Sequence, residues 1–311
     1  MPKILVICGP TASGKTALGV ALAERYGGEV VSADSMQVYR HMDIGTAKPT
    51  AEEMRGVPHH MIDVADPAEN YSVGRYVSEA SAQVEDILAR GKLPMVVGGT
   101  GLYIDALVSG REFAPFTGVW RARLQERLER EGIAPLYDEL SRIDPQRAQR
   151  LHLSDEKRIL RALEVWHETG ETITDHDART AALPPRYDAV RLGLTFERRA
   201  DMWTRIDRRV DEMMDRGLVD EVKGLLRRGV RADCTAMQAI GYKELISALR
   251  GERTVTEAAE EIKLRSRQYA KRQLTWFRRT PDVKWLTWEE TPDFSRALQN
   301  STAYMEESGL V

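Results

Sequence analysis

The sequence predicts an α/β fold in which a parallel sheet is flanked by helices and interrupted by an all-helical insertion. In the first hundred residues, short apolar runs at 4–8, 29–33, 61–64 and 95–97 alternate with helical patterns at about 15–25 and 72–90. Such alternation is typical of parallel strands covered by helices. From about 113 to 185 only amphipathic helical patterns remain. We therefore expect a core domain of residues 1–113 plus 186–311 and a helical insertion at 114–185, with edges near Pro115 and Pro184-Pro185.

The first expected strand leads into a glycine-rich loop, Gly9-Pro10-Thr11-Ala12-Ser13-Gly14-Lys15-Thr16. Its G-x-x-x-x-G-K-[ST] spacing, between an apolar run and a helical pattern, predicts a P-loop NTPase-like sheet. The glycines let backbone N–H groups turn toward an anion, and the next helix presents the positive end of its dipole. Lys15 would supply charge to phosphate oxygens, and Thr16 a hydroxyl to Mg²⁺. The loop predicts a bound polyphosphate without saying which one.

Two further strand ends carry polar groups, and ligands of parallel sheets bind beyond the carboxyl ends of the strands. Asp34-Ser35-Met36-Gln37-Val38-Tyr39 follows the second strand, and Gly98-Gly99-Thr100-Gly101-Leu102-Tyr103 follows a later one. Asp34 is either a general base facing the loop or a turn residue, and the spacing favours neither. Thr100 offers a hydroxyl to a ligand, or belongs to an ordinary strand-to-helix turn. His59-His60 has no partner at ligand spacing, so an ordinary pair at a strand entry is expected.

The insertion should consist of several helices. The pattern at 120–132 ends at a glycine, and Asp144-Pro145 is typical of a helix start. A further helix at 154–170 should begin with Ser154 as its cap and carry basic residues on its remaining faces, namely Lys157, Arg158 and Arg161.

After the insertion the α/β pattern resumes. Arg205, Arg208 and Arg209 cluster on the first helix that follows the returning strand. Residues beyond 290 are polar and carry no prediction. The expected elements are a strand at 189–195, helices at 198–216 and 218–228, a helix from near 235 that carries 237–243, a long helix at 254–279 and an edge strand at 283–286.

The second half of the long helix is strongly basic. Residues 263–279 hold seven basic residues and no acidic one, and Lys263, Arg267, Lys271 and Arg278 share one stripe. Like charges four residues apart oppose helix formation, so the stripe should need a partner anion, and a nucleic-acid backbone is the natural one. The interleaved aromatic residues are expected mostly in the core.

Composition limits the function classes. The 311 residues are 42% hydrophobic and 30% charged, which fits a globular protein with a substantial core. A net charge of −3 excludes a protein that is basic throughout, so any surface for nucleic acid must be local. The two cysteines form no disulfide framework, and neither a signal-peptide segment nor a membrane-spanning run is present. We expect a cytoplasmic protein, and a monomer because the pattern shows no dimer seam.

Seven motifs in order together resemble the tRNA dimethylallyltransferase (tRNA isopentenyltransferase) family, over roughly residues 3–288. They are G-P-T-A-S-G-K-T at 9–16, D-S-M-Q-V-Y at 34–39, D-I-G-T-A-K-P at 43–49, G-G-T-G-L-Y at 98–103, K-R-I-L-R at 157–161, I-G-Y-K at 240–243 and K-R-Q-L-T-W-F-R at 271–278. The resemblance implies transfer of a dimethylallyl group from its diphosphate to N6 of adenosine 37, beside the tRNA anticodon, with release of diphosphate. Family members are commonly labelled ATP-binding, but here the loop would hold diphosphate.

The resemblance also implies roles for particular residues. Asp34 would be the general base, Thr100 and Gln37 would position the adenine, and Ser13, Lys15, Thr16 and Arg205 would hold the diphosphate with Mg²⁺. The anticodon stem-loop would contact Asp34, Ser35, Met36, Gln37, Thr100, Arg123, Lys157, Arg158, Ile159, Leu160, Arg161, Gln238, Ala239, Ile240, Gly241, Tyr242, Lys243, Lys271, Arg272, Gln273, Leu274, Thr275, Trp276, Phe277 and Arg278.

Three alternatives share part of this pattern. An adenylate isopentenyltransferase would use free AMP or ADP with the first three motifs, but would need neither the helical insertion nor the basic helix. A P-loop small-molecule kinase also fits the loop, but the chain has no evident Arg-rich lid. A nucleic-acid-binding ATP switch without enzyme activity would leave Asp34 and Thr100 without a role.

Overall fold

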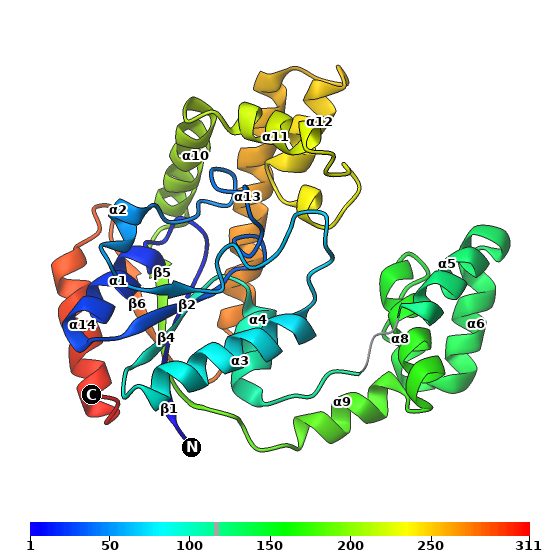
Figure 1. Ribbon diagram of the computed structural model, residues 1–311, viewed down its shortest axis with the longest axis horizontal. Helices are drawn as coiled ribbons and strands as arrows, with labels where there is room; N and C mark the ends of the chain where they lie inside the picture. The colour runs from blue at the N-terminus through cyan, green and yellow to red at the C-terminus, as the bar shows by residue number, and fades with distance from the viewer. Residues whose placement is uncertain (115–117) are drawn as a thin grey trace. The chain divides into compact units, whose positions relative to one another are not determined.

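The computed structural model describes residues 1–114 and 118–311, and these form two compact units. The first combines Met1–Val108 with Arg186–Val311, and the second is Ser109–Pro185 (Figure 1). Pro115, expected near an edge of the insertion, lies outside the described residues.

The first unit is built on one parallel sheet of six strands in the order β3-β2-β4-β1-β5-β6. The central strands are apolar at successive positions because both of their faces are covered, as parallel sheets require. The predicted fold class is therefore confirmed. The strands are β1 (Lys3–Cys8), β2 (Glu29–Ala33), β3 (His59–His60), β4 (Pro94–Gly98), β5 (Asp188–Phe196) and β6 (Val283–Trp288).

Helices bury the two faces of the sheet in separate cores (Figure 1). Ile4 and Val6 of β1 belong to one core, and Leu5 and Ile7 to the other, because successive strand residues point to opposite faces. The helices of this unit are α1 (Lys15–Tyr26), α2 (Ala51–Met54), α3 (Val73–Ala89), α4 (Gly101–Ser109), α10 (Arg199–Asp215), α11 (Leu218–Arg227), α12 (Tyr242–Leu249), α13 (Val255–Phe277) and α14 (Phe294–Glu307), with a 3₁₀ turn η1 (Ala236–Gln238).

Three local predictions were wrong or incomplete. The strand expected at 61–64 is instead β3, at His59–His60, because Met61 and Asp63 have left-handed backbones (φ of 63° and 59°) that end an extended strand. The helix expected from near 235 is divided, since Gly241 at φ 100° separates η1 from α12. The polar C-terminal stretch, which carried no prediction, forms α14 and packs Met305 into the core.

In the described part of the second unit, every regular element is a helix. These helices are α5 (Val119–Glu131), α6 (Ile133–Ile143), α7 (Pro145–Ala148), α8 (Glu156–Thr169) and α9 (Ile173–Ala181). Its core includes Leu124, Leu136 and Leu163. Asp144 caps α7 through the backbone N–H of Arg147, as its Asp-Pro pair predicted. The next helix, α8, begins two residues after Ser154, with Asp155 at the cap position.

Candidate functional site

The glycine-rich loop has three positive φ angles, and one of these positions has no room for a side chain. Gly9 has φ 141°, and a Cβ there would lie 2.5 Å from the carbonyl oxygen of Leu194 on β5. Ala12 and Gly14 also have positive φ angles, of 60° and 85°. The loop therefore turns tightly between β1 and α1, with the left-handed backbone positions that are typical of an anion-binding nest.

Polar side chains of the loop face the same space. The ammonium of Lys15 donates to the carbonyl of Pro10 at 2.6 Å, and burial, aided by the nearby Arg209 cation, lowers the pKa of Lys15 to about 8. The Ser13 hydroxyl is buried and has no hydrogen-bond partner among the described residues. Thr16 lines a polar cavity beside the loop. An anion bound beside the loop would accept hydrogen bonds from both the Ser13 hydroxyl and the Lys15 ammonium.

Gln273 of α13 joins this loop to the third strand end. Its side-chain oxygen accepts from the backbone N–H of Thr11 at 2.8 Å, and its amide donates to the carbonyl of Gly99 at 2.9 Å. Gln273 is buried and its amide is used by these two bonds, so its expected contact with tRNA is corrected to a structural link in the wall of the cavity beside the loop.

Asp34 and Thr100 follow the carboxyl ends of the paired strands β2 and β4. One oxygen of Asp34 accepts from the N–H groups of Met36 (2.9 Å) and Gln37 (3.3 Å), so the residue both forms a turn and lines the cavity. The Thr100 hydroxyl accepts from the N–H of Ser35 at 3.1 Å. The two alternatives for Asp34 are thus compatible, since the turn fixes the direction of its carboxylate.

Gln37 is held by the protein itself. Its amide donates to the carbonyls of Thr46 and Ala47, both at 3.2 Å, and its oxygen accepts from Ser32 at 3.0 Å. These bonds use the donor and acceptor groups expected to position an adenine, so its observed task is to hold the loop that follows.

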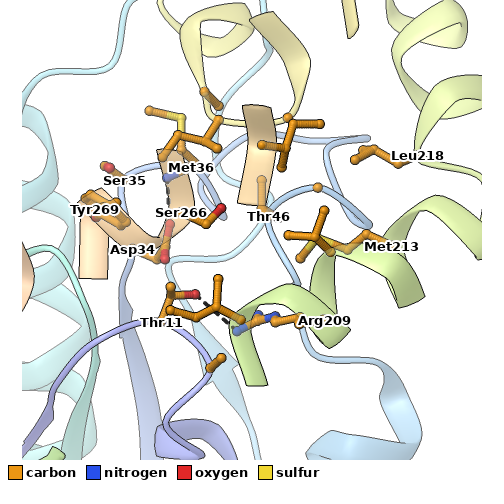
Figure 2. A pocket seen from close by; sticks show the side chains of 18 of the residues that line it. Thr11, Asp34, Ser35, Met36, Thr46, Arg209, Met213, Leu218, Ser266 and Tyr269 are labelled. Carbon is orange, nitrogen blue, oxygen red and sulfur yellow. Dashed lines mark hydrogen bonds between the residues drawn. The ribbon is translucent and has the colours of Figure 1, made fainter. Parts of the chain in front are cut away.

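Two adjoining cavities share several of these residues, and Figure 2 shows the larger of the two. The first, of about 160 Å³, is polar and is lined by the glycine-rich loop. The second, of about 290 Å³, has largely apolar walls that include Met36, Met213 and Ile240. Both are lined by Thr11, Ala12, Asp34, Thr46, Arg209 and Tyr269. The carboxylate of Asp34 therefore faces a polar chamber and an apolar chamber at once.

Arg209 is the functional candidate that sequence reasoning missed. It reaches from α10 to the loop, where its guanidinium donates to the Thr11 hydroxyl at 3.2 Å (Figure 2), and burial lowers its pKa. Arg205, the predicted diphosphate ligand, donates to the Ala12 carbonyl at 3.4 Å and lines a third cavity of about 240 Å³ beside Thr16. The available signal was the spacing of Arg205 and Arg209, which places both on one face of α10.

The basic stripe on α13 is half neutralised, which corrects the expectation of an unpaired stripe. Lys263 pairs with Asp211 at 2.7 Å and Arg267 with Asp207 at 3.2 Å, both on α10. Lys271 and Arg278, farther along, are exposed and have no acidic partner in the described part of the chain. Only this second half of the stripe is available to an external anion.

Several residues expected to contact tRNA are buried instead. The side chains of Ile159, Leu160, Tyr242 and Phe277 belong to hydrophobic cores, so they support neighbouring residues rather than bind RNA. Four other predicted residues line the apolar chamber, namely Gln238, Ala239, Ile240 and Gly241. Lys243, Arg272 and Thr275 are exposed, and Leu274 is half-buried.

In the helical unit, the four predicted cations differ in their surroundings. Lys157 and Arg158 are exposed on α8, whereas Arg161 pairs with the buried Glu164 at 2.8 Å. Arg123 on α5 is exposed and stacks over the ring of Trp120, 4.9 Å from its centroid. Lys157, Arg158 and Arg123 are therefore the exposed cations of this group, and Arg158 lies 3.8 Å from the carboxylate of Asp155.

The histidine pair has structural partners. His59 bonds to the carbonyl of Val57, and His60 to the buried Glu29, each at 2.8 Å. Across residues 1–114 and 118–311, no group of three or more His, Cys, Asp or Glu side chains could hold a metal ion. Over the same residues, no helix combines the length and hydrophobicity needed to span a membrane.

Comparison with known proteins identifies relatives along the whole chain. The family model described as IPP transferase matches residues 37–280, and the one described as Isopentenyl transferase matches residues 2–66. A tRNA dimethylallyltransferase of Caldanaerobacter subterraneus subsp. tengcongensis is 45% identical over 97% of both chains. The solved full-length tRNA isopentenylpyrophosphate transferase of Bacillus halodurans is 44% identical over 100% of this chain and 99% of that one, with a TM-score of 0.73. A eukaryotic dimethylallyltransferase acting on tRNA has a TM-score of 0.84 and 30% identity, and the match covers 99% of this chain and 80% of that one.

Proposed function

The chain belongs to the IPP transferase family, and we propose that it transfers the dimethylallyl group of dimethylallyl diphosphate to N6 of adenosine 37, beside the tRNA anticodon, with release of diphosphate. The observation that carries this proposal is the pair of adjoining chambers with Asp34 in their common wall. One chamber suits a diphosphate, the other suits an apolar group, and the carboxylate lies where the two would meet.

The diphosphate would lie in the polar chamber. The loop N–H groups, Ser13, Lys15 and Arg209 supply donors and positive charge on its walls, and Arg205 would approach from the Thr16 side. The partnerless Ser13 hydroxyl and the Thr16 hydroxyl also fit a diphosphate bound with Mg²⁺, a hard cation that takes oxygen ligands. When bound, Mg²⁺ would neutralise charge on the leaving diphosphate.

The apolar chamber would hold the five-carbon dimethylallyl group. Ile206, Val210 and Met213 of α10 line it from one side, and Ile240 and Ile262 from another. These side chains would exclude water from C1 of the allyl group, which otherwise competes with the adenine as acceptor.

The transfer needs a base because the exocyclic amine of adenine is a weak nucleophile. N6 forms a bond to C1 while the C1–oxygen bond breaks, and the diphosphate leaves with the electron pair. Asp34 accepts the proton that N6 loses. The turn that fixes its carboxylate, and the hydrogen bond between Thr100 and Ser35, would keep the base oriented for this step.

The acceptor would be an RNA loop because the target adenine must leave its stack to reach the cavity. That step is inexpensive in a single-stranded anticodon loop. The exposed cations Lys271, Arg272 and Arg278 on α13, and Arg123 and Lys157 in the helical unit, would bind its phosphates. Free AMP or a small-molecule acceptor would leave these cations without a task, which disfavours the adenylate transferase and kinase alternatives. We expect a monomer that works in the cytoplasm.

A parallel transfer assay tests the proposal. Labelled dimethylallyl diphosphate is offered with Mg²⁺ to tRNA, AMP and ATP, with the Asp34→Asn variant as control. Label should enter only the tRNA, and the variant should bind tRNA while transferring little. Label in AMP alone would establish an adenylate transferase, and label in none would refute prenyl transfer.

A further inference from the structure

Trp276 on α13 is an aromatic residue that is not buried in the core. Its neighbour Phe277 is 1% exposed, as expected for an aromatic of an amphipathic helix, whereas Trp276 is 42% exposed. Exposed tryptophans of this kind often contact a ligand, because the indole is large and apolar.

The protein fixes the orientation of this side chain. Its indole N–H donates to the carboxylate of Asp105 on α4 at 2.8 Å. Its five-membered ring packs on Gly101, where a Cβ would come within 2.3 Å of the ring. The remainder of the indole is exposed in a set orientation, so binding against it would lose little side-chain entropy.

The surroundings of Trp276 point to RNA. Arg272, one helical turn earlier, lines the apolar chamber, and Gln273 lines the polar one. Lys271 and Arg278 are exposed without acidic partners among the residues described. Leu102, next to Gly101, is 48% exposed and extends the apolar surface. An oriented aromatic thus lies among cations on the helix that walls both chambers.

We propose that Trp276 is a stacking platform for an unpaired base of the RNA, next in sequence to the base that enters the cavity. The inference rests on the proposed function. When the target adenine leaves its stack, its neighbour loses a stacking partner, and an aromatic face replaces it. Phosphate binding alone would need the cations but no indole, which is why the platform is assigned to a base.

Steady-state kinetics with an anticodon stem-loop RNA test the assignment. Stacking on an aromatic gives about a 5- to 150-fold effect per base, so W276A should raise KM for the RNA at least fivefold. KM for dimethylallyl diphosphate should not change, and W276F should stay within about threefold of wild type. W203A is the matched control, because Trp203 on α10 is similarly exposed (39%) but lines neither chamber.

Abasic substitutions in the RNA loop identify the stacked base. With the wild-type protein, removing one base beside the target should raise KM, and with W276A the same removal should have little further effect. Additive penalties at every position, or an unchanged KM in W276A, would overturn the assignment. Failure of the proposed function would look different, since the wild-type protein would then transfer no label to any RNA. Equal thermal midpoints for W276A and W203A would exclude a folding defect.

Discussion

Glu221 on α11 should support substrate binding although it lines neither chamber. Its carboxylate accepts from the backbone N–H groups of Asp43 (2.9 Å), Ile44 (2.7 Å) and Gly45 (3.1 Å), and from the hydroxyl of Tyr242 (2.6 Å). The loop that it holds continues into Thr46, whose side chain faces both chambers. We predict that Glu221→Gln loosens this loop and lowers activity.

The magnitude follows from these four bonds. A hydrogen bond to a charged group contributes about 1.5–3 kcal/mol, and partial exposure of Glu221 reduces that contribution. The Gln amide keeps one acceptor oxygen but turns an N–H₂ toward donors that need an acceptor. Water can serve Asp43, which is exposed, but cannot reach the hydroxyl of the buried Tyr242 as easily. A net loss of about 1–3 kcal/mol results, or about 5- to 150-fold in kcat/KM if all of it appears at the site.

Initial rates with both substrates, together with urea unfolding, measure this effect. Asp220→Asn is the control, because it removes one charge from the neighbouring position, whose carboxylate is 80% exposed. Glu221→Gln should raise KM for both substrates while Asp220→Asn stays at the wild-type value. If kcat/KM of Glu221→Gln remains within twofold of wild type, the loop does not depend on the carboxylate and the reasoning fails.

Further predictions concern residues of the site. Asp34→Asn should lower kcat at least 100-fold while tRNA affinity, measured by filter binding, stays near wild type, because a base contributes about 10²–10⁴-fold. Arg209→Gln should raise KM for dimethylallyl diphosphate more than tenfold, and an unchanged value would remove Arg209 from the diphosphate site. Thr16→Ala should raise the Mg²⁺ concentration for half-maximal rate while Thr16→Ser does not, in an EDTA-treated titration. Above a pH of about 8, which is the pKa of Lys15, the free enzyme should bind diphosphate more weakly. Since that pKa is lowered from 10.5 on folding, Lys15 should make the free energy of unfolding rise with pH between about 8 and 10.5, as pH-dependent calorimetry can test.

The polar strand ends could be predicted because their signals are local. Spacing between a strand and a helix specifies the turn from Gly9 to Thr16, and parallel strands bring Asp34 and Thr100 to the same edge of the sheet. Arg209 could not be assigned because its contact with Thr11 joins residues 198 positions apart. The same holds for Glu221, which holds a loop about 177 residues earlier in the chain. Sequence patterns therefore identify neighbours along one element and at the ends of paired strands, but not contacts between a helix and a loop far apart in the chain.

Whether the cations of a helix are paired also depends on the element that packs against that helix. The stripe on α13 gave an expectation of unpaired cations, because only its own helix was considered. The acidic residues of α10 pack against its first half and neutralise Lys263 and Arg267. The second half has no such neighbour among the described residues, so Lys271 and Arg278 keep the role that the stripe indicated. The part of the stripe that the proposed function can assign to RNA is therefore shorter than the sequence implied.

The position of α13 offers a physical reason why the two substrates should depend on each other. Arg272 and Trp276 are exposed and, in the proposed function, would contact the RNA, while Gln273 between them ties the glycine-rich loop to the carbonyl of Gly99. A shift of this helix on RNA binding would move Gln273 and, with it, the backbone N–H of Thr11. Each substrate should then change the affinity of the other by the same factor, because coupling free energies are reciprocal. Gln273→Leu, which removes both bonds, should bring that factor toward one, as titrations of diphosphate with and without stem-loop RNA would measure. A coupling factor that survives this change would show that the link runs through another element.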